Sequence, residues 1–180
     1  MGLVPPRRIL VSYAHSDNES TDPSQRWLDR LNEMVAPLHM SNEIGIWTDR
    51  DIKTGDKWRT HIEEVVRTAE VAVLLVSPAY LASKFIRESE LPTLLYRAQH
   101  EHRGVDILPV ILRHCLYDEA RFTYPQPDGT EDSVALSVFQ SINSPAEPLE
   151  GMSRNNQDLV LLTLARRMYA VFKAKAPVSR

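Results

Sequence analysis

Four short apolar runs alternate with segments of helical periodicity, and this alternation constrains the fold of the chain most. The runs are Ile9–Tyr13, Ile44–Trp47, Val71–Val76 and Val105–Leu112. Strands that alternate with helices form parallel sheets, and the buried strands of such sheets are apolar at nearly every position. We therefore predict an α/β protein with a central parallel sheet and helices on both of its faces.

The segments between these runs have apolar residues at helical spacing. One such segment carries Trp27, Leu28, Leu31, Met34 and Val35, and the next carries Trp58, Ile62, Val65, Val66 and Ala69. The helix after Val76 contains Pro92, which cannot donate a hydrogen bond to the Glu88 carbonyl. We expect this helix to be kinked or to restart near Glu90.

The pattern weakens after Leu112. Residues 124–132 are predicted to form a turn-rich surface loop, and residues 141–156 a second polar connection. A closing helix is expected at about 157–173, with Leu161, Leu164, Met168 and Phe172 on its inner face. The length of 180 residues suggests one domain over 1–180, with a core at about 7–113 and a C-terminal extension at about 114–175.

Composition narrows the range of partners. The formal net charge is −3 and no cluster of Lys and Arg is present, so neither nucleic acid nor an anionic membrane is an expected partner. Cys115 is the single cysteine, which excludes an internal disulfide and favours a cytoplasmic location. No apolar run approaches the roughly 20 residues that span a bilayer.

Several common sites are not expected. The chain has six glycines and neither GxGxxG nor a P-loop motif, so a dinucleotide would be bound as a substrate and not as a redox cofactor. His100 and His102 point apart on a helix and no other pair has the spacing of zinc ligands, so we predict no metal and no cofactor. Ser12, His15 and Asp17 lack the turn of a hydrolase nucleophile.

Glu90 follows the third apolar run on its helix, which places it near the carboxyl end of the predicted sheet. Ligands of open α/β sheets bind at this edge. A carboxylate there could stabilise a cationic, sugar-centred transition state. The alternative interpretation is that Glu90 is a solvated helix residue.

Five segments, in order, carry a family resemblance. They are Ile9–Tyr13 with Asp17, then Ile46–Ile52 with Gly55–Trp58, Val73–Pro78, Tyr80–Ser83 and Glu90–Pro92. In this order and spacing they resemble the TIR (Toll/interleukin-1 receptor) domain of bacterial type. The resemblance implies a flavodoxin-like fold with four or five parallel strands.

The resemblance also implies one of two functions. Many TIR domains cleave NAD⁺ into nicotinamide and ADP-ribose or a cyclic isomer, and others are adaptors that bind TIR domains without catalysis. For this chain we favour an NAD⁺ glycohydrolase that acts in antiphage immunity, is activated by self-association and responds to a sensor domain or partner protein. The alternative is a non-catalytic adaptor that binds through residues 48–56.

The family's catalytic glutamate falls on Glu90, which precedes Leu91 and Pro92. Glu88 is a rival, because the spacing ahead of the motif differs by one residue from the family pattern. Trp47 could stack on nicotinamide or adenine, although a packing role is equally open.

The resemblance adds further candidates for substrate binding at the same edge. They are Ser12, Tyr13, Ala14, His15, Asp49 and Ser77. Family members often carry an arginine where this chain has Ala14 and His15. Asp49 and Asp51 have the alternative role of solvated or loop-capping carboxylates, and Trp58 is assigned to the core.

Overall fold

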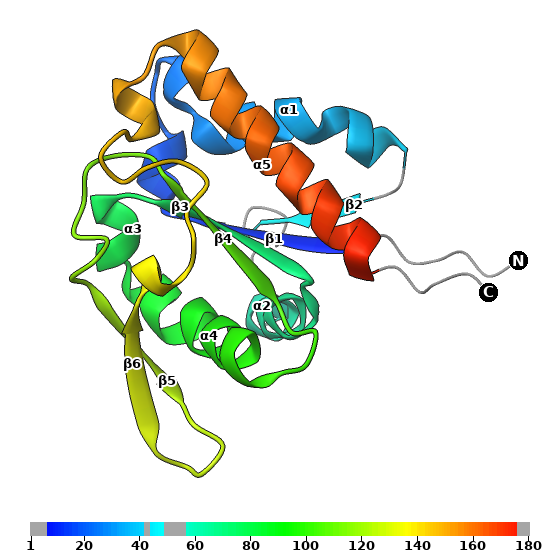
Figure 1. The fold of residues 1–180 in the computed structure, drawn as a ribbon, viewed down its shortest axis with the longest axis vertical. Helices are drawn as coiled ribbons and strands as arrows, with labels where there is room; N and C mark the ends of the chain where they lie inside the picture. The colour runs from blue at the N-terminus through cyan, green and yellow to red at the C-terminus, as the bar shows by residue number, and fades with distance from the viewer. Residues whose placement is uncertain (1–6, 42–43, 49–56, 176–180) are drawn as a thin grey trace, which may run out of the picture.

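Four parallel strands form the centre of the protein in the order β2-β1-β3-β4 (Figure 1). The computed structural model describes residues 7–41, 44–48 and 57–175. The strands are β1 (Arg7–Tyr13), β2 (Ile44–Trp47), β3 (Val71–Val76) and β4 (Asp106–Ile111). The sheet confirms the predicted flavodoxin-like α/β fold. Each strand lies within two residues of the corresponding apolar run.

Helices cover both faces of this sheet (Figure 1). On one face, α1 (Trp27–Met40) and α5 (Arg154–Lys175) pack over the odd-numbered residues of β1 and β3. On the other face lie α2 (Lys57–Thr68), α3 (Pro78–Ala82) and α4 (Leu91–His100). Two apolar cores result, because successive side chains of a strand point to opposite faces of the sheet.

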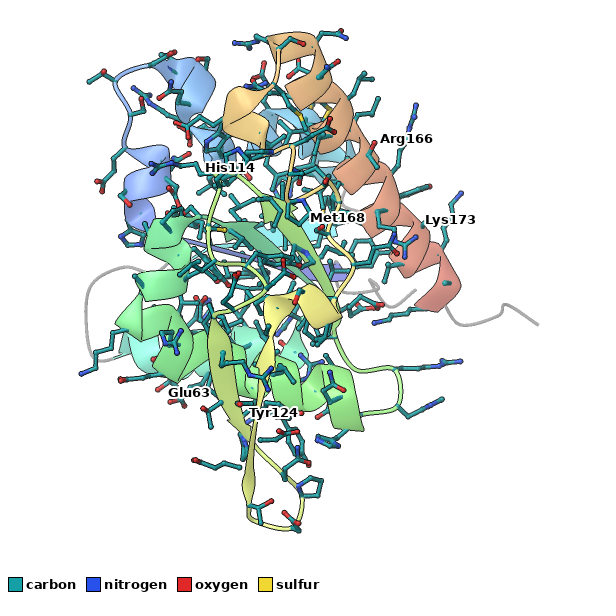
Figure 2. All side chains as sticks on the ribbon, turned by 60° about the vertical axis from the view of Figure 1, so that its left-hand side comes forward. Glu63, His114, Tyr124, Arg166, Met168 and Lys173 are labelled. Atoms are coloured by element: carbon teal, nitrogen blue, oxygen red, sulfur yellow. The ribbon has the colours of Figure 1, made fainter. Side chains whose placement is uncertain are left out.

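The closing helix α5 begins three residues before the predicted start and belongs to the core beside α1. Its predicted inner residues are all buried: Leu161, Leu164, Met168 and Phe172. Met168 points inward, whereas Arg166 and Lys173 project from the outer side (Figure 2). Across the described residues, no helix is long and apolar enough to cross a membrane.

The prediction of a surface loop over residues 124–132 is wrong at both ends. Strands β5 (Arg121–Pro125) and β6 (Glu131–Ala135) form an antiparallel hairpin, and only residues 126–130 make the turn. Phe122 and Tyr124 are buried in the apolar core on the α4 side of the sheet, while Arg121, Thr123 and Pro125 face solvent. In β5, buried and exposed residues alternate along only five positions, and the neighbouring turn-forming residues made this short pattern hard to recognise from the sequence.

The polar connection after the hairpin covers the edge strand β4. The Ile142 amide donates to the Pro109 carbonyl at 2.8 Å. Asn143 accepts a hydrogen bond from the Ile111 amide and donates one to the Ile111 carbonyl, both at 2.9 Å. An edge strand exposes unpaired backbone groups, and this segment satisfies those of β4 in place of a fifth strand.

Short turns complete the chain. Two 3₁₀ turns, η1 (His15–Asn18) and η2 (Pro23–Gln25), join β1 to α1. Two more, η5 (Leu136–Val138) and η6 (Leu149–Gly151), lie between the hairpin and α5.

The edge-covering role of Asn143 leads to a prediction. Asn143→Ala leaves the buried amide and carbonyl of Ile111 without the partners that the side chain supplies, so we expect it to reduce the free energy of unfolding by about 2 kcal/mol. Urea denaturation measures this difference. Asn155→Ala, on the exposed first turn of α5, is the matched control and is expected to change stability by less than about 0.5 kcal/mol. Equal effects of the two substitutions would contradict the assignment.

Candidate functional site

The strand order reverses between β1 and β3, which have β2 and β4 on their outer sides. In open α/β sheets, ligands bind outside the carboxyl ends of the strands at such a reversal. Ser12 lies one residue before the end of β1, and Ser77 immediately follows β3. Both serines are buried. The candidate site is built around them.

Glu90 reaches this point from the helical layer. Its carboxylate accepts a hydrogen bond from the Ser12 hydroxyl at Oε2, and its residue is only 4% exposed. The interpretation of Glu90 as a solvated helix residue is therefore wrong. The rival Glu88 points away, with a side chain 64% exposed and 3.9 Å from the Lys84 ammonium group. The structure brings Glu90, and not Glu88, to the ends of the strands.

An irregular turn directs Glu90 inward. Residues Ile86–Glu90 form a π-helical turn, η4, which closes with a hydrogen bond from the Leu91 amide to the Ile86 carbonyl. The regular helix α4 begins at Leu91, with Pro92 in its first turn. Pro92 has no amide to continue the hydrogen-bond ladder. The predicted restart near Glu90 is thus confirmed, and the wider π turn is the form that it takes.

Tyr80 is a member of the site that sequence reasoning missed. It is fully buried, and its hydroxyl lies 3.1 Å from the Ser12 hydroxyl. Burial, followed by the negative charge of Glu90, holds the pKa of Tyr80 well above its ordinary value. The available signal was the segment Tyr80–Ser83, which carries the family resemblance but suggested no role for the ring.

A second carboxylate joins the same cluster. The Ser77 hydroxyl donates to Asp17 Oδ2 at 2.5 Å and accepts a bond from the Tyr80 amide at 3.0 Å. Burial raises the pKa of Asp17, and the hydrogen bond from Ser77 partly opposes this effect. We call the five hydrogen-bonded residues Asp17, Ser77, Tyr80, Ser12 and Glu90 the Tyr80 network.

Other predicted residues lie around this network without joining it. Tyr13 was expected in the same crevice as Ser12, but its side chain packs in the opposite core with α1 and α5, because adjacent strand residues face opposite ways. Ala14 is buried on the Glu90 side of the sheet. His15 is exposed, with its ring centroid 5.5 Å from that of Tyr13.

Trp47 ends β2 on the same side of the sheet as Glu90. It is half-buried, packs against the core that contains α2 and α4, and has its ring centroid 5.1 Å from that of His61. This position is compatible with both packing and stacking on a ligand. Asp49 and Asp51 lie outside the described residues, as does the side chain of Trp58.

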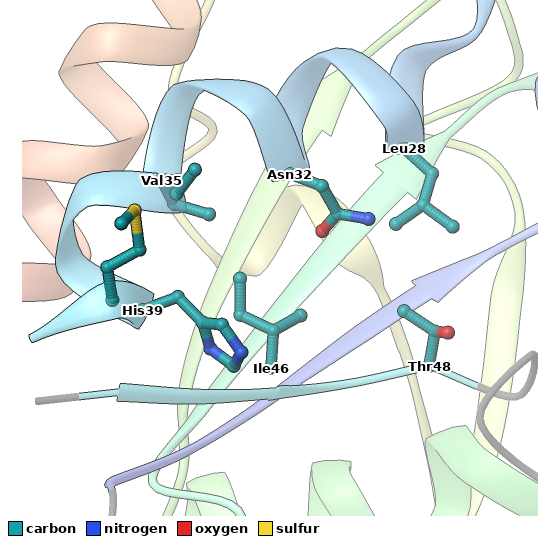
Figure 3. A pocket seen from close by; sticks show the side chains of 8 residues that line it. Leu28, Asn32, Val35, His39, Ile46 and Thr48 are labelled. Atoms are coloured by element: carbon teal, nitrogen blue, oxygen red, sulfur yellow. The ribbon is translucent and has the colours of Figure 1, made fainter. Parts of the chain in front are cut away.

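A pocket of about 320 Å³ lies between α1 and β2. Asn32 and His39 of α1 line it together with Ile46 of β2 (Figure 3). Ile46 packs against the core of α1 and α5. The pocket is therefore on the opposite face of the sheet from Glu90. Within the described part of the chain, no cluster of three or more His, Cys, Asp or Glu side chains could hold a metal ion.

The raised pKa of Asp17 predicts a dependence of stability on pH. The folded protein holds this proton more tightly than the unfolded chain, so the stabilising contribution is complete below the unfolded pKa of 3.8 and is lost as pH rises through the folded value. We expect the stability of the wild type to fall relative to Asp17→Asn as pH rises above about 4. Urea denaturation across this range measures the difference.

Asp22 provides a control of opposite sign. Hydrogen bonds from the side chain and backbone of Ser24 lower its pKa. The wild type is therefore expected to gain stability relative to Asp22→Asn as pH rises. Parallel pH profiles for wild type and Asp17→Asn would contradict the burial of an Asp17 charge.

Comparisons with known proteins agree with this architecture. The sequence model of the TIR domain family matches residues 9–143. The uncharacterised protein y4lF of Sinorhizobium fredii (strain NBRC 101917 / NGR234) is 27% identical over 114 residues, which cover 63% of this chain and 32% of that relative. The chain thus corresponds to about a third of y4lF. Since the family model matches more than half of the chain, including the four strands from Ile9 onward and the Tyr80 network, the chain belongs to the TIR domain family.

Proposed function

We propose that this TIR domain is an NAD⁺ glycohydrolase with Glu90 as its catalytic residue. The observation that carries the proposal is a carboxylate, buried and hydrogen-bonded to Ser12, at the carboxyl end of β1 where the strand order reverses. The exposed Glu88 offers no comparable environment.

The reaction needs little more than a positioned negative charge. The bond between the ribose carbon and the nicotinamide nitrogen breaks with its electron pair on nitrogen, so the cationic ring leaves as neutral nicotinamide. No general acid is needed. The ribosyl centre develops oxocarbenium character, which a nearby carboxylate stabilises. Water then adds to the ribosyl carbon and loses a proton to give ADP-ribose, or an adenine nitrogen adds to give a cyclic isomer.

The burial of Glu90 suits this role. A charge acts more strongly in a site that excludes water, and a carboxylate fixed before the reaction needs no reorganisation as the cation forms. The carboxylate can also accept hydrogen bonds from ribose hydroxyls, which become better donors as positive charge develops. Both interactions strengthen in the transition state and therefore increase kcat.

The same burial supports activation by self-association. At 4% exposure, Glu90 contacts a ribose only after neighbouring segments rearrange. Contacts with a second copy are a source of free energy for such a rearrangement, since binding shifts a protein toward the conformation that it favours. We propose that a sensor domain or partner protein triggers this assembly, as part of an antiphage response.

The decisive experiment compares Glu90→Gln with Glu88→Gln at high protein concentration in a crowded solution. Glu90→Gln removes the charge but retains the side-chain shape, so we expect nicotinamide release to fall at least about a hundredfold. Glu88→Gln is the matched control and is expected to change the rate less than about twofold, since its side chain points to solvent. Chromatography of NAD⁺, nicotinamide and the second product measures the rate and distinguishes ADP-ribose from a cyclic isomer.

The wild type also provides a decisive negative result. A folded protein that self-associates visibly and releases no nicotinamide would overturn the glycohydrolase. It would favour the adaptor, for which a buried carboxylate at Glu90 has a structural role only.

Trp47 offers a further prediction about the substrate. Loss of an aromatic stacking partner weakens the binding of a base by roughly 1–3 kcal/mol, so we expect Trp47→Ala to raise the KM for NAD⁺ about tenfold with a smaller change in kcat. Steady-state kinetics of assembled protein measure both constants. An unchanged KM together with a lower melting temperature would instead assign Trp47 to packing alone.

A further inference from the structure

Tyr80 contacts Ser12, one residue before the end of β1, and Ser77, immediately after β3, and it uses a different group for each contact. Its hydroxyl lies 3.1 Å from the Ser12 hydroxyl, and its amide donates to the Ser77 hydroxyl at 3.0 Å. The partners in the first contact are 68 residues apart in the sequence. One buried tyrosine therefore joins α3 to β1 and also bonds to the residue that immediately follows β3.

The hydrogen bonds of Ser12 have a defined direction. A serine hydroxyl has one proton to donate and can accept further bonds. Ser12 uses this proton in its hydrogen bond to Glu90. In the contact between the two hydroxyls, Tyr80 is therefore the donor and Ser12 the acceptor. The burial that raises the pKa of Tyr80 keeps its hydroxyl protonated and able to donate. The chain of donors thus runs from Tyr80 through Ser12 to the carboxylate.

We propose that Tyr80, acting through Ser12, is a positioning residue that holds the Glu90 carboxylate in its reactive orientation at the ends of β1 and β3. This inference rests on the proposed glycohydrolase function. It assigns Ser12, which the sequence suggested as a substrate contact, to the support of Glu90. In this proposal the fully buried Tyr80 affects the reaction only through Ser12.

The physical reason is the rotational freedom of a serine hydroxyl. A hydroxyl without a second partner rotates among the acceptors around it, whereas a bond accepted from Tyr80 occupies a lone pair and favours donation to Glu90. Small displacements of a reacting group lower rates strongly, because catalysis depends on a fixed near-attack geometry.

Tyr80 is itself held in place. Ser77 is the N-cap of α3, Pro78 occupies the first turn, and the hydroxyl of Ser77 donates a hydrogen bond to Asp17. The capping bond fixes the start of α3 relative to β3, and a proline at this position is pre-organised for a helix. The ring of Tyr80 is fully buried in the core that includes α2 and α4. The Tyr80 side chain is therefore held by packing in the orientation that donates to Ser12.

The ionisable groups on the surrounding elements differ from Tyr80 in their exposure. His61 of α2 is half-buried beside Trp47. On α4, Arg97 is buried, donates to the Val66 carbonyl at 2.7 Å and pairs with Glu101. Apart from Glu90, the following ionisable side chains of α2 and η4 are exposed: Glu63, Glu64, Arg67, Arg87 and Glu88. Solvent screens these exposed charges, so the hydroxyls of Ser12 and Tyr80 dominate the local environment that the variants alter.

The test uses Tyr80→Phe, Ser12→Ala and the double variant, with Tyr117→Phe as the matched control. Tyr117 is also a buried tyrosine, and its hydroxyl donates to the carbonyls of Leu136 and Phe139 at 3.0 and 3.1 Å, within a different part of the fold. Each Tyr→Phe change removes one buried hydroxyl and keeps the ring. Loss of stability alone is therefore matched between the two variants.

We expect Tyr80→Phe to lower the kcat of nicotinamide release about tenfold with KM unchanged, since only the orientation of Glu90 is affected. Ser12→Ala is expected to lower kcat further. The double variant is expected to match Ser12→Ala, because Tyr80 acts through Ser12 and the two effects are not additive. Tyr117→Phe keeps the wild-type kcat. Independent, additive losses from Tyr80→Phe and Ser12→Ala would overturn the proposal.

A second readout does not depend on turnover. Carbon-13 NMR of protein labelled at glutamate carboxyls follows the titration of Glu90, whose resonance is identified by its absence in Glu90→Gln. Loss of donors to a carboxylate favours its protonated form. The titration of Glu90 is therefore expected to move to higher pH in Ser12→Ala, to move less in Tyr80→Phe, and to stay in place in Tyr117→Phe.

The two readouts separate the possible failures. An active wild type whose kcat and Glu90 titration are both unaffected by Tyr80→Phe would overturn the positioning role and leave the glycohydrolase standing. An inactive wild type would overturn the glycohydrolase, and the titration would still decide whether Tyr80 orders Glu90.

Discussion

A parallel sheet has to be covered on both faces, and this constraint organises the whole protein. The buried strand β3 has no exposed residue, so its two faces require two separate apolar cores. Helices α1 and α5 supply one core, and α2, α3 and α4 supply the other. Because β2 and β4 lie on opposite sides of the central pair, the strand order reverses between β1 and β3. The edge at which a site can form follows from this reversal.

The burial that this fold requires explains the Tyr80 network. Two serines, two carboxylates and a tyrosine hydroxyl lie where the strands end, and all five residues are buried. Buried polar groups are costly without partners, and here the hydroxyls of Ser12 and Ser77 donate hydrogen bonds to Glu90 and Asp17. The same bonds hold a charge in a low-dielectric position suited to the proposed chemistry. Structure and proposed function therefore depend on one set of contacts.

The agreement between sequence and structure is best where the signal is local. Apolar runs locate the four strands to within two residues, and Pro92 indicates the restart of the helix at Leu91. The β5–β6 hairpin was missed because each of its strands is short and lies next to residues typical of turns. Only two residues of β5 and three of β6 are shielded from solvent, which is too few for a clear pattern. Asn143 was missed for another reason: it pairs with Ile111, 32 residues away, and no local pattern indicates such a contact.

The sequence alone determined the α/β class, the succession of strands and helices, and the presence of a glutamate near the carboxyl ends of the central strands. These properties depend on short-range periodicity and on the chemistry of single residues such as Pro92. Only the tertiary structure showed that Glu90 is buried against Ser12 while Glu88 is exposed, turned Tyr13 away from the site and brought Tyr80 to Ser12. Each of these outcomes depends on side-chain direction across elements far apart in sequence, as in the bond between Ser12 and Glu90, which are 78 residues apart. Such contacts arise from the packing of helices on the sheet, which local sequence does not encode.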